Sequence, residues 1–336
     1  MIHQLYHLVT DCTDPFHNLA LEEQLLRRVE EGACILYLWQ NQHTVVVGRN
    51  QNPWAECQTE LLEAEGGRLV RRLSGGGAVY HDLGNLNFTF LVREADYSVP
   101  RQLEVILHAL NALGIPAERS GRNDILADGR KCSGNAFYRS EGRCYHHGTL
   151  LVDVDRAAMS RYLTVDPAKL AAKGVASVRA RVVNLKELQP ELTIPVLIRQ
   201  LLDSFQAVYG LPSSPFSADE EALAERIAFF SSWDWRFGSA PPFTAQIQGR
   251  FNWGGLQLCF SVEQGAVVHT ALYSDGLEAD FLAGLPACFT GCRYEVPALT
   301  ARLAAVPADG EAQCRILADA AGLIGQLFHR EETSHV

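Results

Sequence analysis

The chain has 336 residues, 47% of them hydrophobic and 20% charged, which is enough to bury a full core and to form about two domains. Its formal net charge of -10 gives no general attraction to phosphate backbones or anionic membranes, which argues against nucleic-acid binding. No basic leader precedes an apolar core, and no apolar run approaches the roughly 18 residues of a membrane helix. We therefore expect a cytoplasmic protein without a membrane partner.

The cysteines and lysines add two compositional observations. The nine cysteines are odd in number and contain no CxxC pair with metal-site spacing, which predicts reduced thiols. Of the 29 basic residues, 25 are arginine and only four are lysine. Arginine-biased coding explains that imbalance, but it does not explain why all four lysines (Lys131, Lys169, Lys173 and Lys186) fall within one 56-residue window.

The first third of the chain predicts one helix followed by strands. Asp14 and Pro15 form a cap and a first helical position, and the apolar spacing that follows predicts an amphipathic helix before Gly32. The runs 34–39 and 44–47 are predicted to be a pair of strands joined by a turn, and a helix is predicted from Pro53 to about residue 65. Three further runs (68–73, 78–80 and 85–92) alternate with glycine and predict a sheet with loops at its edge.

The remainder predicts helices and then a small second domain. Leucine spacing predicts a helix that stops at Gly114, and Asp128-Gly129 predicts a turn between two strands. Helices dominate residues 155–227, and the pattern breaks near Pro241-Pro242 before new strands at 250–274. We predict a larger domain at 1–246 and a small α+β domain at 250–336.

The densest chemical signal is the segment RRLSGGGAVYHDLG at residues 71–84. Three consecutive glycines allow backbone amides to approach a ligand and hold phosphate oxygens, although a plain turn explains such a triplet about as well. Arg71 and Arg72 face opposite ways in a strand, so we expect one to clamp phosphate and the other to be solvated. The sequence does not choose between them.

A second constellation places Asp124 and Lys131 across a short turn. A lysine ammonium can contact a carboxylate and an α-phosphate together, and Asp124 could hold Mg²⁺ against the same phosphates. A surface salt bridge worth about 0–1 kcal/mol explains the pair equally well. Cys132 is predicted to be a buried structural thiol, because its side chain faces away from that of Lys131 and no base is apparent.

Two further segments carry histidines and basic residues. Adjacent His146 and His147 cannot easily ligate one metal from a strand, so we expect one to face a site and the other to pack elsewhere. The stretch 167–183 combines lysines and arginines with few large apolar residues. It predicts either a basic loop that closes over an anionic intermediate or a solvated connector.

Four motifs in order resemble the lipoate-protein ligase A family: RRLSGGGAVYHDLGN at 71–85, GRNDI at 121–125, GRKCSGNAF at 129–137 and HHGTLL at 146–151. The likeness extends to DPFHNLALEE, NPWAEC and AAKGVASVRARVVNL, and so spans essentially the whole chain. Leu73 and Cys132 depart mildly from the family pattern. The resemblance implies a mixed-sheet catalytic domain of the class II aminoacyl-tRNA synthetase and biotin-ligase type with an α+β accessory domain.

The resemblance also implies an activity. The enzyme would use MgATP to convert (R)-lipoate to lipoyl-AMP and pyrophosphate, and then transfer the lipoyl group to a lysine of an acceptor. Implied acceptors are the lipoyl domains of 2-oxoacid dehydrogenase E2 subunits and the glycine cleavage H protein, and the implied state is a monomer that scavenges exogenous lipoate.

Site residues carry over from the family motifs position by position. Lys131 would be the catalytic residue, touching both lipoate and the adenylate, and Asp124 would hold Mg²⁺. The remaining implied positions are Arg72, Gly77, Ala78, Val79 and Tyr80 for ATP; Ser74, Gly75, Gly76, His81 and His147 for lipoate; and Lys173, Gly174, Ser177 and Arg179 for an adenylate-binding loop.

Three alternatives remain open. An octanoyl transferase of the same fold needs a cysteine, and the stretch 167–183 has none. A biotin ligase is disfavoured because a GRGRxGR-type loop is absent. A noncatalytic lipoate or adenylate sensor would bind ligand without releasing pyrophosphate.

Overall fold

The computed structural model describes residues 1–120, 124–164, 182–237, 245–263 and 265–326. The chain divides into two compact units, each described here by itself. The first comprises Met1–Val47, Pro53–Arg72 and Ala78–Arg236. The second comprises Gly48–Asn52, Leu73–Gly77 and Phe237–Val336.

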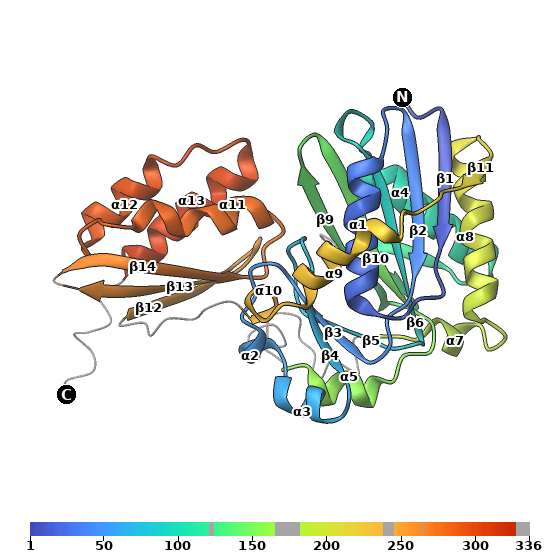
Figure 1. Cartoon of the computed structure of the whole chain (residues 1–336), viewed down its shortest axis with the longest axis horizontal. Coiled ribbons are helices and arrows are strands. Elements are labelled where there is room, and N and C mark those ends of the chain that lie inside the picture. Colours follow the sequence, from blue (N-terminus) through green and yellow to red (C-terminus); the bar gives the residue numbers. More distant parts are fainter. Residues whose placement is uncertain (121–123, 165–181, 238–244, 264, 327–336) are drawn as a thin grey trace. The chain divides into compact units, whose positions relative to one another are not determined.

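The first unit is built on an eight-stranded sheet with the order β11-β1-β2-β6-β10-β9-β8-β7 (Figure 1). Its strands are β1 (Gln4–Val9), β2 (Ala33–Trp39), β6 (Asn85–Arg93), β7 (Ala117–Ser120), β8 (Asp124–Ala127), β9 (Arg130–Ser140), β10 (Arg143–Leu151) and β11 (Ser213–Pro215). β1 runs parallel to β2 and β11, whereas the other neighbours are antiparallel. The predicted mixed-sheet fold is confirmed.

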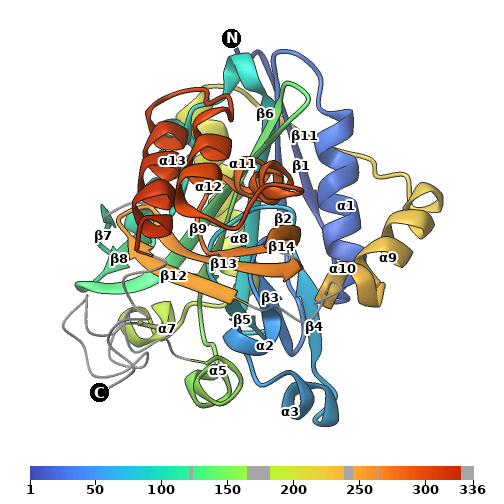
Figure 2. The ribbon, with the colours of Figure 1, turned by 90° about the vertical axis from the view of Figure 1, so that its left-hand side faces the viewer.

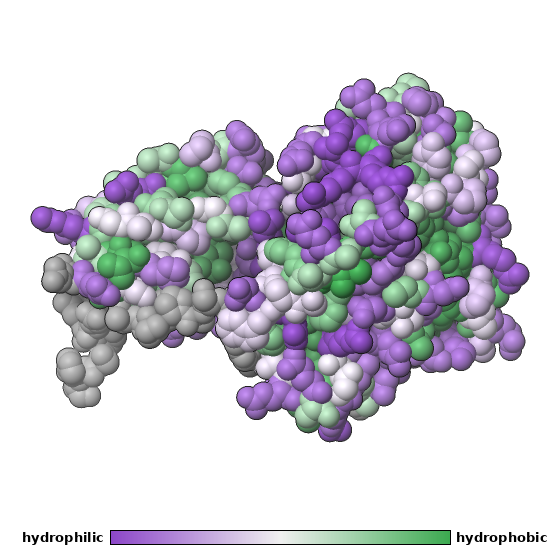
Figure 3. Space-filling model, in the orientation of Figure 1, coloured by the Kyte–Doolittle hydropathy of each residue, from purple (hydrophilic) through white to green (hydrophobic). Residues whose placement is uncertain are grey.

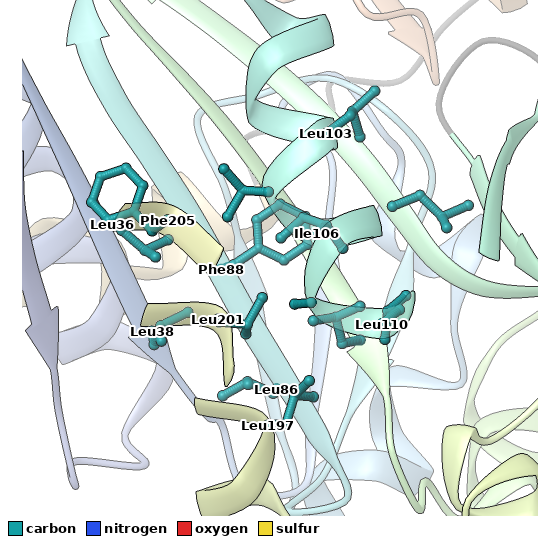
Figure 4. Packing of buried hydrophobic residues seen from close by; sticks show 14 of the residues in the cluster. Leu36, Leu38, Leu86, Phe88, Leu103, Ile106, Leu110, Leu197, Leu201 and Phe205 are labelled. Atoms are coloured by element: carbon teal, nitrogen blue, oxygen red, sulfur yellow. The ribbon is translucent and has the colours of Figure 1, made fainter. Parts of the chain in front are cut away.

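One face of this sheet carries the hydrophobic core. Two amphipathic helices, α4 (Val99–Ala112) and α8 (Ile194–Tyr209), cover it (Figure 4). The interlocking side chains are Leu36, Leu38, Leu86, Phe88, Leu103, Ile106, Leu110, Leu197, Leu201 and Phe205. Burial of each such side chain contributes about 1.5–3 kcal/mol, so this face supplies much of the stability of the unit.

Helix α1 (Pro15–Arg28) contacts strands β2, β4, β6 and β10. Asp14 caps it, accepting hydrogen bonds from the amides of Phe16 at 2.8 Å and His17 at 3.3 Å, and Pro15 is the first helical residue. The helix predicted from the sequence is therefore confirmed. Its buried side includes the polar residues Asn18 and Glu22 as well as leucines.

A smaller three-stranded sheet has the order β4-β3-β5, made by β3 (Thr44–Val47), β4 (Arg68–Arg71) and β5 (Val79–His81). The expected pairing of 34–39 with 44–47 is wrong, because β2 and β3 belong to different sheets. The helix expected from Pro53 to residue 65 is also interrupted, and forms α2 (Pro53–Glu56) and α3 (Thr59–Ala64). The other short helices are η1 (Glu94–Asp96), α5 (Arg156–Tyr162), α7 (Leu185–Leu188), η3 (Glu221–Leu223), α9 (Ala224–Ser231) and α10 (Trp233–Phe237).

The second unit packs helices on one side of an antiparallel sheet (Figure 2). Its elements are β12 (Ala245–Phe251), β13 (Gly254–Glu263), β14 (Ala266–Ser274), α11 (Ala279–Gly284), η4 (Leu285–Phe289), α12 (Val296–Ala304) and α13 (Glu311–Ile324). Strands precede helices, as the sequence predicts. Because β12 begins at Ala245, the domain boundary expected at residue 246 falls inside a strand.

The large hydrophobic side chains exposed among the described residues are Met1, Val9, Leu61, Leu83, Trp233 and Val268. They come from separate elements, and Figure 3 shows hydrophobic areas broken up by hydrophilic ones on the face that it draws. Within the described ranges, no helix combines the length and the apolarity that crossing a bilayer requires.

Candidate active site

Polar residues gather on the sheet face opposite the hydrophobic core. The strand register aligns three of them in one row with a glycine and a tryptophan: Asp124 pairs with Gly134, Thr149 with Asn87, and Asn87 with Trp39. The Gly134 amide donates to Thr149 Oγ1 at 3.2 Å, which joins the two halves of the row. Because side chains alternate along each strand, the row lies on a single face, which we call the polar face.

A β-bulge brings Lys131 onto the polar face. Ile125 pairs with Ser133 and Leu126 pairs with Lys131, so Cys132 is an extra residue without a partner on β8. An inserted residue reverses the alternation of a strand, and Lys131 therefore points to the same side as Gly134 and Asp124. The backbone is held there by a hydrogen bond of 2.9 Å from the Val183 amide to the Lys131 carbonyl.

Lys131 and Asp124 form an ion pair with 2.8 Å between Nζ and Oδ1. The lysine side chain is 35% exposed and the aspartate 18%, so solvent or a ligand can reach both. A Cβ on Gly134 would lie 2.8 Å from Lys131 Nζ, which means that the absence of a side chain at Gly134 makes room for the ammonium group. Lys131 and Asp124 are therefore close together, as expected for two residues of one hairpin. The β-bulge is the feature that brings them together.

Cys132 lies on the core side of the bulge. It is fully buried, and its Sγ donates to the Ile125 carbonyl at 3.5 Å. Burial raises the pKa of the thiol to about 12. The thiolate is the nucleophilic form, so this cysteine is unsuited to carry an acyl group at neutral pH.

The two histidines of β10 lie on opposite faces. His147 Nδ1 lies 2.9 Å from Glu22 Oε1, and a carboxylate accepts, so this ring nitrogen carries a hydrogen. Thr89 donates to the same carboxylate oxygen at 2.7 Å and accepts from the Trp39 indole at 3.1 Å. Glu22 thereby fixes the orientation of His147 on the polar face.

His146 points into the core. Its ring nitrogens lie 3.2 Å from Gln102 Oε1 and 2.9 Å from Asn135 Oδ1. Burial, with a smaller effect of His147, lowers the pKa of His146 to about 3, so the ring is neutral. It serves packing and not a metal.

Both arginines before the glycine loop are buried, which corrects the expectation that one is solvated. The Arg71 guanidinium donates to the carbonyls of Trp235 and Arg236, both at 2.8 Å, and so ties β4 to α10. Arg72 donates to the Val46 carbonyl at 3.2 Å. Burial lowers the pKa of Arg72 to about 10, offset in part by Tyr145 and Glu22, so it stays cationic at pH 7 next to the polar face.

The glycine loop, Ser74 to Gly77, belongs to the second unit. The Ser74 carbonyl accepts from the Arg49 amide at 2.9 Å, and the Gly76 amide donates to Gly276 at 3.3 Å. A Cβ on Gly75 would lie 2.1 Å from the Gly276 carbonyl oxygen, and Gly76 has φ of +92°. Gly77 differs, because no atom of the described residues lies within 4 Å of its Cβ position.

The residues after the loop form β5. Ala78 and Val79 are half-buried, and Tyr80 is buried with its ring stacked on Tyr162 at 5.7 Å between centroids. Burial raises the pKa of Tyr80 well above its usual range. His81 is buried against Trp39, with 6.3 Å between ring centroids. Lys173, Gly174, Ser177 and Arg179 lie outside the described residues.

Several polar-face residues were missed at the sequence level. Glu22 lies three positions after Leu19 and four before Leu26, which places a carboxylate on the apolar side of a helix. That placement was the signal by which the sequence could have identified Glu22 as a site residue. Gly134, Thr149, Asn87 and Trp39 gave no such signal, because their alignment depends on strand register.

The described residues contain no group of three or more His, Cys, Asp or Glu side chains that could hold a metal ion by itself. Mg²⁺ usually takes one or two protein carboxylates and completes its shell with water and substrate phosphates. Asp124, a partly exposed carboxylate beside Lys131, fits that mode of binding.

Two family models match the chain. The lipoyl protein ligase A/B catalytic domain matches residues 14–206, and the bacterial lipoate protein ligase C-terminus matches residues 240–316.

Solved structures give a consistent comparison. P. falciparum LipL1, solved in complex with lipoate, is 28% identical with a TM-score of 0.82, and the match covers 96% of this chain and 99% of that one. The bi-partite lipoate protein ligase of Thermoplasma acidophilum, studied with its E2 lipoyl domain, is 26% identical with a TM-score of 0.62 over 73% and 100%. A lipoate-protein ligase A bound with ATP is 26% identical with a TM-score of 0.61 over 71% and 99%.

Proposed function

Because the chain belongs to the lipoyl protein ligase A/B catalytic domain family and carries the matching C-terminal domain, we propose that it attaches lipoate to a protein lysine in two ATP-dependent steps. The observation that carries this proposal is the Lys131–Asp124 pair, which a bulge directs onto the polar face. Relatives solved with lipoate and with ATP support the choice of substrates.

In the first step, a lipoate carboxylate oxygen attacks the α-phosphorus of ATP. The bond from the α-phosphorus to the bridging oxygen breaks, and pyrophosphate leaves. Lys131 would contact the carboxylate and the α-phosphate together and oppose the charge that builds up between them. Arg72, which stays cationic, and the amides around Gly77 to Tyr80 would hold the nucleotide.

Mg²⁺, held by Asp124 and the phosphates, would neutralise phosphate charge. Asp124 is then shared between the metal and Lys131, so its carboxylate would place both cations around the phosphates. Ser74 to Gly76, His81 and His147 would bind lipoate. Lys173, Gly174, Ser177 and Arg179 would contribute to an adenylate-binding loop.

In the second step, the amine of an acceptor lysine attacks the acyl carbon of lipoyl-AMP. The bond from the acyl carbon to the phosphate oxygen breaks, AMP leaves, and the amine loses a proton as the amide forms. Lys131 would stabilise the oxyanion without forming a covalent bond. The T. acidophilum pair supports a lipoyl domain as acceptor, and we extend the proposal to E2 subunits and the glycine cleavage H protein.

The proposed setting is the cytoplasm, with the chain acting as a monomer. All nine cysteines are free thiols, which suits a reducing compartment. An octanoyl transferase mechanism is disfavoured, because the thiol nearest Lys131 is buried with a raised pKa.

The test is lipoate-dependent pyrophosphate release followed by lipoylation of an apo lipoyl domain. Lys131→Ala should abolish both reactions while the protein still folds. Lys186→Ala is the matched control, because Lys186 makes a surface ion pair with Asp153 and should be dispensable. Near-normal pyrophosphate release by Lys131→Ala, or ligand binding without any release by the wild type, would contradict the proposal.

A further inference from the structure

Two buried N–H donors near Trp39 have no acceptor among the described residues: His81 Nε2 and Asn87 Nδ2. The side chains that carry them are only 3% and 2% exposed. A buried donor left without an acceptor costs about 1–3 kcal/mol, so two of them close together indicate a place where a ligand supplies acceptors.

A chain of side chains fixes which His81 nitrogen carries the hydrogen. Asn18 Nδ2 donates to two backbone carbonyls, at 3.0 Å and 2.8 Å, which identifies it as the nitrogen. The same nitrogen lies 3.0 Å from Asn41 Oδ1, so Asn41 turns its amide nitrogen toward His81 Nδ1 at 3.3 Å. His81 Nδ1 must then accept, and Nε2 carries the hydrogen.

Tyr37 completes this relay, because its hydroxyl donates to Asn18 Oδ1 at 3.1 Å and holds that amide in place. Burial lowers the pKa of His81 to about 3, with further lowering by Arg72 and His147. The ring is therefore neutral, with one donor. A neutral N–H group is suited to donate a hydrogen bond to an uncharged acceptor atom.

Asn87 forms a hydrogen bond with a neighbouring side chain. Its Oδ1 accepts from Asn85 Nδ2 at 2.9 Å, and its Nδ2 has no acceptor among the described residues. Asn87 pairs with Trp39, and the Trp39 ring contacts His81, so both donors lie beside the same indole. β6 lies two strands from β9, so Asn87 is about 10 Å across the sheet from Gly134, the neighbour of Lys131.

We propose that His81 and Asn87 are specificity residues that recognise acceptor atoms at the tail of the acyl substrate, namely the dithiolane sulfurs, and so favour lipoate over octanoate. This inference rests on the proposed function, which places the substrate carboxylate at Lys131. Sulfur is a weak acceptor, but an alkyl tail offers none and leaves both donors unpaired. Sites that hydrogen-bond a substrate discriminate strongly against analogues that lack the partner.

The test compares kcat/KM for pyrophosphate release with lipoate and with octanoate. The wild type should prefer lipoate at least tenfold. Asn87→Leu and His81→Phe should each reduce that preference about tenfold, because kcat/KM for lipoate should fall more than kcat/KM for octanoate. Asn111→Leu, on the exposed side of α4, is the matched control and should keep the wild-type ratio. Equal preference in the wild type, or an unchanged ratio in both variants, would overturn the inference.

A second measurement reports the tautomer of His81 directly. Ring ¹⁵N chemical shifts of His81 should report the neutral Nε2–H tautomer, and Asn41→Leu, which removes the relay, should populate the other tautomer. An Nδ1–H tautomer in the wild type would overturn the inference even if the variants did not fold. A wild type that releases pyrophosphate with neither acid would instead contradict the proposed function.

Discussion

At the scale of single residues, the environment of Lys131 is set by a neighbour without a side chain. The sequence predicts that Lys131 and Asp124 meet across the Asp128-Gly129 turn, and they do, with both turn residues at positive φ. It gives no sign of the bulge at Cys132, because a bulge changes strand alternation without changing residue types. The close approach of Lys131 to Gly134 therefore could not be predicted without the strand register.

Substitution of Gly134 tests this packing. In Gly134→Ala the new Cβ would meet Lys131 Nζ at 2.8 Å and push it away from Asp124. We expect kcat for pyrophosphate release to fall by about 10- to 100-fold, since displacements near 1 Å have effects of that size. The melting temperature should change little, because the flexible end of a lysine can move.

The matched control for that substitution is Gly322→Ala in α13, where nothing lies within 4 Å of the Cβ position. It should leave kcat unchanged and stabilise the helix slightly. Full activity in Gly134→Ala would show that the ammonium group does not need this position.

At the scale of elements, the sequence predicted where a helix, a turn and strands form. It did not predict which strands pair with one another. The capped helix α1 and the Asp128-Gly129 turn follow from residue types that act on their own backbone. The runs 34–39 and 44–47 are strands, but apolar runs do not specify which strand they pair with. The glycine loop combines a local signal with a packing constraint. Its glycine triplet is typical of a ligand-binding loop, and its close packing also requires glycine.

Single alanines in the glycine loop separate packing from ligand binding. Gly75→Ala should lower both thermal stability and activity, because its Cβ would collide with the Gly276 backbone. Gly77→Ala should fold with near-normal stability, because no described atom lies within 4 Å of its Cβ position, and yet weaken ATP binding at the proposed nucleotide site. Melting curves with and without ATP, beside kcat/KM for ATP, make the comparison. Equal behaviour of the two variants would contradict this division of roles.

At the scale of the whole molecule, segments distant in sequence share one unit. Gly48–Asn52 and Leu73–Gly77 cluster with residues from Phe237 onward, so no single cut in the chain separates the two units. The Ser274 amide donates to the Asn50 carbonyl at 2.7 Å, and Arg49 forms an ion pair with Asp280. Sequence composition can locate a linker, but it cannot show that earlier loops join the later unit.

Buried histidines make stability depend on pH. His81 and His146 have pKa values of about 3 when folded, against about 6.5 when unfolded. Below pH 6.5 the unfolded chain binds protons that the folded chain does not, so the free energy of unfolding falls as pH drops toward 3. At pH 5 each histidine should cost about 2 kcal/mol relative to pH 7.

Urea unfolding followed by far-UV circular dichroism should show a lower midpoint at pH 5 than at pH 7. His146→Gln keeps an amide near Gln102 and Asn135 and should reduce the difference between the two pH values. A midpoint that does not change between pH 5 and pH 7 would contradict the neutral, buried state of both rings.

The row of residues across the sheet would set the length of the proposed acyl substrate. From Gly134 on β9 to Trp39 on β2 there are three strand spacings, or about 14 Å. Backbone hydrogen bonds fix the spacing between neighbouring strands, whereas loops can move. The sheet would therefore set the length of the acyl chain. Variation in the surrounding loops could then change partners or rates over evolutionary time without changing the length of chain that the enzyme accepts.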